Sequence, residues 1–433
     1  MIGIFQKIID VRSRFSRYTT IIGFLSIYCL VLLLLGYLQW QRLEKYGHTR
    51  PSTNALYYRV SLNLIQGQMP YRDFAFEYPP LALLPIILPH LIKLGRVVNP
   101  SDYAWLFMLE NVLMSMLLGL TIMRIASYFQ PWPHCLRVLA VYGLLSMIIA
   151  PLLLGRYDLF PTLLMGVAVM EAIGGHPTRS GVWLGLGVAA KLFPIVLLPI
   201  LSIYYLVSRN YRSLLGVFVG VTVSVGLTLL PFLPIGMDQL LSFLRYHQLR
   251  GLQIESVLAG IALAAHVLIF SPVTVEYNFG ALHITSSIAD TVLPWLPTLS
   301  ILTFAVVFIT LINCFRCEFE ENGVITNEHL LLSLLSALLT FIVTSKVFSP
   351  QYISWLLPLA SFLRLRQIIL VAVVFAMTIV IYPFMYDRLV ALQTLPIVLL
   401  NVRNFLTVVL LVWLVYSTVT GHQKKHFCVY REA

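Results

Sequence analysis

Apolar stretches follow one another along almost the whole chain, and this serial pattern constrains the fold more than any other feature. A helix needs about 20 residues to cross a bilayer, and most of these stretches reach or approach that length. A single apolar stretch could be a buried core helix, but a long series could not. The stretches cover 18–40, 79–92, 103–123, 138–154, 157–174, 181–206, 213–234, 257–270, 288–315, 329–345, 350–363, 367–384 and 397–419.

Composition leads to the same class of protein. Hydrophobic residues make up 59% of the 433 residues and charged residues only 11%, whereas a soluble domain has about 25% charged residues. The sequence therefore predicts an all-α polytopic membrane helical bundle of about 11–13 transmembrane helices, some of them broken or tilted.

The chain divides into two short ends and one long apolar unit. Residues 1–17 are basic and precede an apolar stretch too long for a cleaved signal peptide. They predict a cytoplasmic N-terminus, which would place the loop 41–78 outside, although that loop carries cations of its own. Residues 18–419 are expected to form a single transmembrane domain, and 420–433 a polar basic tail.

The formal net charge of +11 does not indicate nucleic acid as a partner. Cations at helix ends, beside anionic lipid headgroups, account for most of it. Cys314 and Cys317 have C-x-x-C spacing, but no second pair or histidine cluster completes a metal site, so no metal is expected. The chain contains neither a Walker-type phosphate loop nor an H-E-x-x-H motif, which disfavours ATP-driven transport and metalloprotease chemistry.

Ionisable residues near the spans are the best indicators of a site, because they are costly in a membrane unless paired or facing water. The first cluster precedes Pro79 and contains Arg72, Asp73, Glu77 and Tyr78. Either carboxylate could be a general base, and one helical turn would place both on the same side. Alternatively, Glu77 is only a helix-start charge and the aromatics an interfacial belt.

The second and third clusters interrupt apolar stretches. Arg156 and Asp158 are either a structural pair or cap, or part of a site. Lys191 stands three residues before Pro194 within an apolar stretch. It would either snorkel to an interface, pair with a carboxylate or meet an anionic ligand.

The fourth and fifth clusters are loops rich in hydrogen-bonding groups. An arginine fork suits phosphate oxygens, although a charged loop can simply be solvated. Non-helical backbone at membrane depth must be buried in protein or line a cavity, although an ordinary turn is the alternative. The fourth cluster contains Arg245, His247, Arg250, Gln253 and Glu255, and the fifth contains Lys346, Gln351 and Tyr352.

Taken in order, these clusters resemble glycosyltransferase family 87, the polyprenyl-phosphate-mannose-dependent alpha-mannosyltransferases of the type C superfamily. The resemblance extends from about residue 52 to residue 358 and rests on several short motifs in the family's order. The motifs are Pro70-Tyr71-Arg72-Asp73-Phe74 with Glu77-Tyr78-Pro79-Pro80, Gly155-Arg156-Tyr157-Asp158, Lys191-Leu192-Phe193-Pro194, Arg250-Gly251-Leu252-Gln253-Ile254-Glu255-Ser256 and Lys346-Val347-Phe348-Ser349-Pro350-Gln351-Tyr352.

The resemblance implies a type C glycosyltransferase-like fold in the cell membrane, with its site facing the periplasm or exterior. It implies inverting transfer of mannose or a similar hexose from a polyprenyl-phosphate sugar to a lipid-linked or glycan acceptor, without a cofactor. Asp73, Glu77 or Asp158 would be the base. The other substrate-binding candidates are Arg72, Tyr78, Arg156, Lys191, Arg245, His247, Arg250, Gln253, Glu255, Lys346, Gln351 and Tyr352.

One departure from the family pattern concerns the catalytic base. Family members usually carry an acid a few residues before the Tyr-Tyr pair, where this chain has Ser52-Thr53-Asn54. Another carboxylate would have to take its role, or the chemistry is impaired or different. The main alternative is therefore a transporter or flippase of lipid-linked sugar without transferase activity. A glycan polymerase is disfavoured because 271–287 is short and contains no arginine.

Overall fold

The computed structural model describes residues 2–46, 53–92 and 98–429. Within these residues, seven helices are long and apolar enough to cross a membrane. The all-α membrane bundle predicted from the sequence is thereby confirmed. These helices belong to α1 (Ile2–Tyr46), α4 (Pro100–Ser127), α10 (Tyr211–Leu229), α15 (Leu296–Asn322), α16 (Asn327–Thr344), α18 (Leu365–Ile379) and α20 (Thr394–Val429).

Shorter helices account for most of the remaining apolar stretches, because prolines and one lysine interrupt them. The stretch 181–206 is two helices, separated where Lys191 adopts extended backbone and Pro194 opens a 3-10 turn, η3 (Phe193–Val196). The expectation of a span at 350–363 is wrong. That stretch forms the 3-10 helix η6 (Pro350–Leu356) and the four-residue α17 (Leu357–Ala360), with a proline near the start of each. The shorter helices are α3 (Leu83–Ile92), α5 (Trp132–Ile148), α6 (Ala150–Gly155), α7 (Leu159–Ile173), α8 (Pro177–Ala190), α9 (Leu197–Val207) and α13 (Val257–Ile269).

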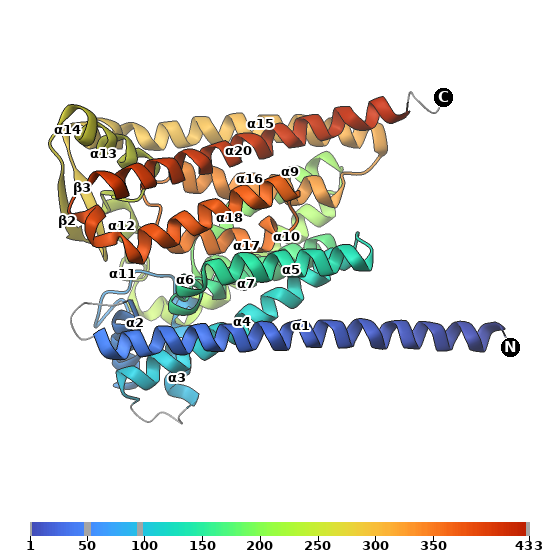
Figure 1. Ribbon diagram of the computed structural model, residues 1–433, viewed down its shortest axis with the longest axis horizontal. Coiled ribbons are helices and arrows are strands. Elements are labelled where there is room, and N and C mark those ends of the chain that lie inside the picture. Colours follow the sequence, from blue (N-terminus) through green and yellow to red (C-terminus); the bar gives the residue numbers. More distant parts are fainter. Residues whose placement is uncertain (1, 47–52, 93–97, 430–433) are drawn as a thin grey trace.

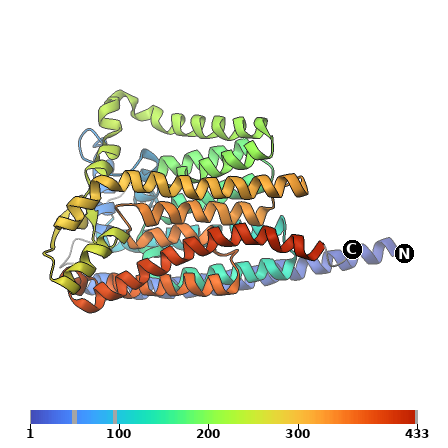
Figure 2. The same cartoon turned by 90° about the horizontal axis from the view of Figure 1, so that it is seen from above.

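Both described ends of the chain lie at one end of the bundle, and the irregular segments gather at the other (Figure 1). The view from above shows the same separation along the bundle (Figure 2). The irregular end includes α2 (Thr53–Ile65), η2 (Pro80–Ala82), η4 (Leu230–Ile235), α11 (Met237–Leu240), α12 (Ser242–Leu249), α14 (Ser287–Val292), η5 (Leu293–Trp295), η7 (Val380–Phe384) and α19 (Tyr386–Val390).

A small antiparallel sheet at this end was not anticipated from the sequence. Its strands β1 (Leu252–Gln253), β2 (Thr274–Asn278) and β3 (Ala281–Thr285) are ordered β1-β3-β2. Gly280 has φ +68° in the β2–β3 turn, a conformation that glycine adopts without steric cost. The sheet joins the fourth cluster to the segment 271–287 through the pairing of Gln253 with His283.

Close packing of small residues joins α8 to α10. A Cβ built on Gly181 would lie 2.2 Å from the carbonyl oxygen of Val217, and one on Gly220 would lie 2.4 Å from that of Thr178. The backbones approach so closely because neither glycine has a side chain, an arrangement common between membrane helices.

Buried hydroxyls connect α1 to α4 and α5. The Tyr28 hydroxyl lies 2.6 Å from Oγ of Ser115 and 2.8 Å from Oγ of Ser146. Ser115 Oγ also lies 2.7 Å from the Tyr142 hydroxyl. These polar groups satisfy one another inside an otherwise apolar core, as an environment without water requires.

Candidate active site

A polar cavity of about 510 Å³ lies at the irregular end of the bundle. Its wall combines segments that are far apart in the sequence, from α2 through to α19. The structure therefore brings together residues from every cluster identified in the sequence. The predicted site residues that line it are Glu77, Tyr78, Arg156, Lys191, His247, Arg250, Gln253, Glu255, Gln351 and Tyr352.

Five predicted site residues lie outside the lining of this cavity: Arg72, Asp73, Asp158, Arg245 and Lys346. Arg245 is exposed. Lys346 donates a hydrogen bond of 2.7 Å to the backbone carbonyl of Gln248. Its ammonium thus supports the loop beside Arg250.

Asp73 and Glu77 do not share a side of a helix, and that expectation is wrong. Residues 71–78 are non-helical, with Tyr71 at φ 69° and its N–H donating to the Phe74 carbonyl over 3.0 Å. Asp73 accepts hydrogen bonds from the Arg72 guanidinium and, over 2.7 Å, from the Met69 N–H. The hydrogen bonds from Arg72 and Met69 lower the pKa of Asp73 to about 2, so this carboxylate is already paired at the surface.

Glu77, in contrast, faces the cavity among phenol groups. Its carboxylate lies near the Tyr78 and Tyr246 phenols, and burial together with the Glu77 charge raises the pKa of both phenols. The β2–β3 turn also comes close, because a Cβ on Gly280 would lie 3.5 Å from Oε2 of Glu77. Glu77 is therefore a cavity carboxylate among neutral phenols.

Asp158 is one of the most deeply buried acids of the described residues, with 2% of its surface exposed. Its Oδ1 accepts hydrogen bonds from Lys191 Nζ at 2.7 Å and from the Trp355 indole at 2.8 Å. The Trp355 ring is itself stacked between Phe193 and Tyr352, with centroid distances of 3.9 and 3.8 Å. These contacts lock Asp158 behind the cavity wall.

Lys191 connects that buried acid to the cavity. Its ammonium lies 4.8 Å from the ring centroid of Tyr157, 5.4 Å from that of Tyr78 and 5.9 Å from that of Tyr352. Aromatic faces stabilise a cation that is removed from water. The extended backbone at Lys191, between α8 and η3, directs the side chain into this setting.

Two arginines and a histidine supply further nitrogen donors. Nη2 of Arg156 donates a hydrogen bond of 2.9 Å to the Tyr382 hydroxyl. The Arg250 guanidinium lies 5.8 Å from the Tyr246 ring centroid, and its buried Nε has no hydrogen-bond partner among the described residues. Burial and the nearby cations, Arg250 first, lower the pKa of His247 to about 4, so this ring is neutral at pH 7.

An amide, a hydroxyl and a carboxylate form another polar part of the wall. Gln253 Nε2 donates to Glu255 Oε2 over 3.3 Å and to Ser349 Oγ over 3.2 Å. Burial raises the pKa of Glu255 to about 7, against the lowering effect of Arg403 and Arg156. Glu255 Oε1 is buried without a hydrogen-bond partner among the described residues.

The sequence analysis did not assign several residues at this site. Tyr246 stood within the fourth cluster but carried no charge to mark it. Tyr382 and Tyr386 line the cavity from beyond the last cluster. Arg403, which contacts the Glu255 backbone from outside the cavity lining, did have a signal, since it interrupts the apolar stretch 397–419 as Lys191 interrupts its own.

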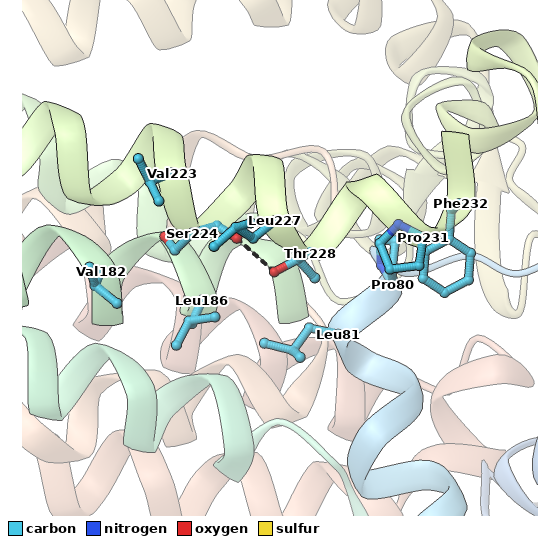
Figure 3. Close-up of a pocket in the computed structure, with 10 residues that line it drawn as sticks. All are labelled: Pro80, Leu81, Val182, Leu186, Val223, Ser224, Leu227, Thr228, Pro231 and Phe232. Atoms are coloured by element: carbon cyan, nitrogen blue, oxygen red, sulfur yellow. Dashed lines mark hydrogen bonds between the residues drawn. The ribbon is translucent and has the colours of Figure 1, made fainter. Parts of the chain in front are cut away.

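A second cavity, of about 500 Å³, is almost entirely apolar and lies between η2, α8 and α10 (Figure 3). Pro80 and Leu81 form its end nearest the first cluster, three and four residues after Glu77. Ser224 and Thr228 also line it, and the Thr228 hydroxyl donates a hydrogen bond of 2.7 Å to the backbone carbonyl of Ser224.

The sequence model of glycosyltransferase family 87 matches residues 76–350. The chain belongs to glycosyltransferase family 87. The match begins one residue before Glu77 and ends at Pro350, so it contains most of the polar cavity wall. A comparison with curated proteins finds no match. The family and the apolar helices together make this chain a multi-pass membrane glycosyltransferase.

Proposed function

We propose that the polar cavity transfers a hexose, mannose in the first instance, from a polyprenyl-phosphate sugar to a lipid-linked or glycan acceptor. The observation that carries the proposal is the juxtaposition of the Glu77 carboxylate with the cations Arg156, Lys191 and Arg250 in a single cavity. Base and phosphate site would then act on the same anomeric carbon.

Glu77 is the proposed general base. It lines the cavity, whereas Asp73 is paired at the surface and Asp158 is held behind the wall by two hydrogen bonds. Glu77 would take the proton of the acceptor hydroxyl as that oxygen attacks the anomeric carbon. The bond from that carbon to the phosphate oxygen breaks, and attack from the opposite face inverts the configuration.

The departing polyprenyl phosphate carries negative charge, which the cavity cations are suited to stabilise. The Nε of Arg250, which is buried and has no hydrogen-bond partner among the described residues, supports a role in binding phosphate oxygens. Lys191 contributes charge from its aromatic surroundings. The proposal invokes no metal and no nucleotide sugar.

The apolar cavity beside η2 supports a lipid-linked substrate. It begins next to the loop that carries Glu77 and continues between α8 and α10 toward the apolar part of the bundle (Figure 3). A polyprenyl chain that lies there would keep its phosphate near the polar cavity. In the cell membrane, a cytoplasmic N-terminus would turn this end of the bundle to the periplasm or exterior.

The decisive experiment uses purified protein with polyprenyl-phosphate mannose and a membrane lipid extract as acceptor. Asp73→Asn, Glu77→Gln and Asp158→Asn are assayed in parallel for donor consumption and new glycosylated product. The proposal is supported if folded Glu77→Gln loses turnover while Asp73→Asn retains it. If the wild type consumes no polyprenyl sugar but moves it across liposomes, the transporter interpretation replaces it.

A further inference from the structure

Arg403 is a charged residue inside an apolar helix, and the cavity lining does not include it. Its side chain is completely buried in α20, in a segment apolar enough to span the membrane. A guanidinium is costly in such a place unless something compensates for it. The residue also lies beyond 76–350, the stretch that matches the family.

Its hydrogen bond is directed to the segment that follows β1, and its guanidinium packs on an aromatic ring of the fifth cluster. Nη2 of Arg403 donates 3.0 Å to the backbone carbonyl of Glu255, and Nδ2 of Asn404 donates 3.2 Å to that of Ser256. The guanidinium carbon lies 4.0 Å from the Phe348 ring centroid. Consecutive side chains of α20 thus hold the backbone that presents Glu255.

A close helix contact makes this possible. A Cβ on Gly260 would lie 2.7 Å from Oδ1 of Asn401 and 3.1 Å from Nδ2 of Asn404. Glycine at this position therefore lets α20 approach α13 closely enough for Arg403 to reach the start of that helix. Most side chains at position 260 would separate the two.

The Glu255 carboxylate is left half satisfied by this arrangement. Gln253 donates to Oε2, while Oε1 has no partner among the described residues although the residue is 1% exposed. Glu255 belongs to the cavity lining together with Gln253 and Ser349. A buried carboxylate oxygen without a donor in a ligand cavity is suited to accept a hydroxyl from the ligand.

The protonation state of Glu255 determines how well it accepts a hydrogen bond, because a protonated carboxyl is a weaker acceptor than a carboxylate. The charged or titratable groups around it are Arg403 from α20, Arg156 from the α6–α7 junction and Tyr386 from α19. The two arginines lower the pKa of Glu255 against the larger effect of burial. Of the two arginines, Arg403 lowers the pKa of Glu255 more than Arg156 does.

We propose that Arg403 is a positioning residue that keeps Glu255 oriented and ionised so that its free oxygen accepts a sugar hydroxyl of the substrate. This inference rests on the proposed function for the identity of the ligand, a polyprenyl-phosphate hexose or the sugar of its acceptor. It adds a specificity-determining contact that depends on a helix outside the family-matched segment.

The test compares binding of polyprenyl-phosphate mannose with binding of polyprenyl phosphate alone, across pH 6–9. The Kd for polyprenyl phosphate divided by the Kd for polyprenyl-phosphate mannose reports the contribution of the sugar separately from those of the phosphate and the lipid. Glu255→Gln and Arg403→Met should each reduce that ratio by about 10- to 100-fold and leave the Kd for polyprenyl phosphate unchanged. Arg403→Lys should restore most of the loss.

Two further readouts separate positioning from a merely structural role. In Arg403→Met, the pH at which sugar binding sets in should move upward, because Glu255 loses its main positive neighbour. The double variant with Glu255→Gln should bind no worse than either single variant. Thr407→Val, which removes a buried hydroxyl that donates 2.8 Å to a backbone carbonyl of its own helix, is the matched control and should keep the wild-type ratio.

Two results would overturn the inference. One is a folded Arg403→Met variant whose sugar ratio and acceptor KM are both unchanged. The other is a double variant in which the losses of sugar binding from Arg403→Met and Glu255→Gln add. If donor binding is unchanged but the acceptor KM rises in both variants, the hydroxyl belongs to the acceptor and the positioning role stands. If Arg403→Met does not fold, Arg403→Gln is judged by the same readouts. A sugar ratio that depends on both residues in a protein without transfer activity would contradict the proposed function alone.

Discussion

Lys191 and Asp158 form an ion pair of 2.7 Å between Nζ and Oδ1, with 13% of the lysine side chain exposed and 2% of the aspartate. The two residues come from different breaks in the helical pattern and meet where the bundle opens into the polar cavity. The pair thus joins the structural core to the site. Lys191 lines the cavity, whereas Asp158 lies behind its wall.

Removal of one member should destabilise the protein strongly. Asp158→Asn or Lys191→Met leaves a buried charge without its partner, at a cost of about 3–5 kcal/mol. The double variant should unfold at a higher temperature than either single variant, because neither charge remains. Thermal unfolding in detergent checks this, and a double variant that shows the summed loss would contradict it.

Glu77→Gln should lower kcat by about 10²- to 10⁴-fold, the usual contribution of a general base. The unfolding temperature and the donor Kd should stay near the wild-type values, because the amide keeps the shape of the side chain. Asp73→Asn is the matched control, since its carboxylate is bonded to Arg72 outside the cavity. Equal loss in both variants would argue against Glu77 as the base.

Arg250→Ala should raise the Kd for polyprenyl phosphate by about 10- to 100-fold, the effect of losing hydrogen bonds to a charged group. Arg250→Lys should recover only part of the affinity, because an ammonium lacks the bidentate fork. Arg245→Ala is exposed and outside the cavity, so it serves as the control. Direct binding to labelled polyprenyl phosphate gives the measurement.

Stability should fall as pH rises from about 4.5 to 7 on account of Glu255. Its pKa is about 7 in the folded chain against an ordinary value of 4.5, with burial as the main cause. The folded state therefore holds the proton more tightly in that window and loses about 3 kcal/mol across it. Glu255→Gln lacks this loss, so its stability relative to wild type should increase from pH 5 to pH 8. Parallel thermal-unfolding curves against pH for the two proteins would refute the prediction.

Gly181→Val should disrupt the α8–α10 contact, because its Cβ would lie 2.2 Å from the backbone oxygen of Val217. We expect a marked drop in unfolding temperature and in the yield of folded protein. Gly226→Ala, on the partner helix α10, is the control, since no atom lies within 4 Å of the position its Cβ would take. Tolerance of Gly181→Val would mean that the helices can separate.

The helical membrane fold was predictable because apolar stretches of membrane-crossing length are a direct physical signal. The polar breaks around Lys191 and Arg250 were equally visible, since charge near a span requires a reason. Long-range pairing was not. Nothing in the sequence states that Asp158 meets Lys191 rather than a substrate, or that Asp73 turns to Arg72 and away from Glu77.

Other features were missed because their signals are weak in a sequence. The sheet is built from strands of two to five residues, too short for an alternating pattern to be recognised. The phenols Tyr382 and Tyr386 look like interfacial aromatics until the fold places them in the cavity wall. Proline at 350 and 358 did mark the loss of a regular span there, but apolar composition suggested a helix.

The placement of Tyr382 and Tyr386 has a consequence for how such enzymes diverge. Part of the polar cavity wall is encoded after residue 350, past the end of the stretch that the family model matches. Substitutions there can reshape the chamber while every shared motif stays intact. Two members with the same motifs can therefore differ in the sugar they accept, and substrate preference should follow the C-terminal helices more closely than the motifs themselves.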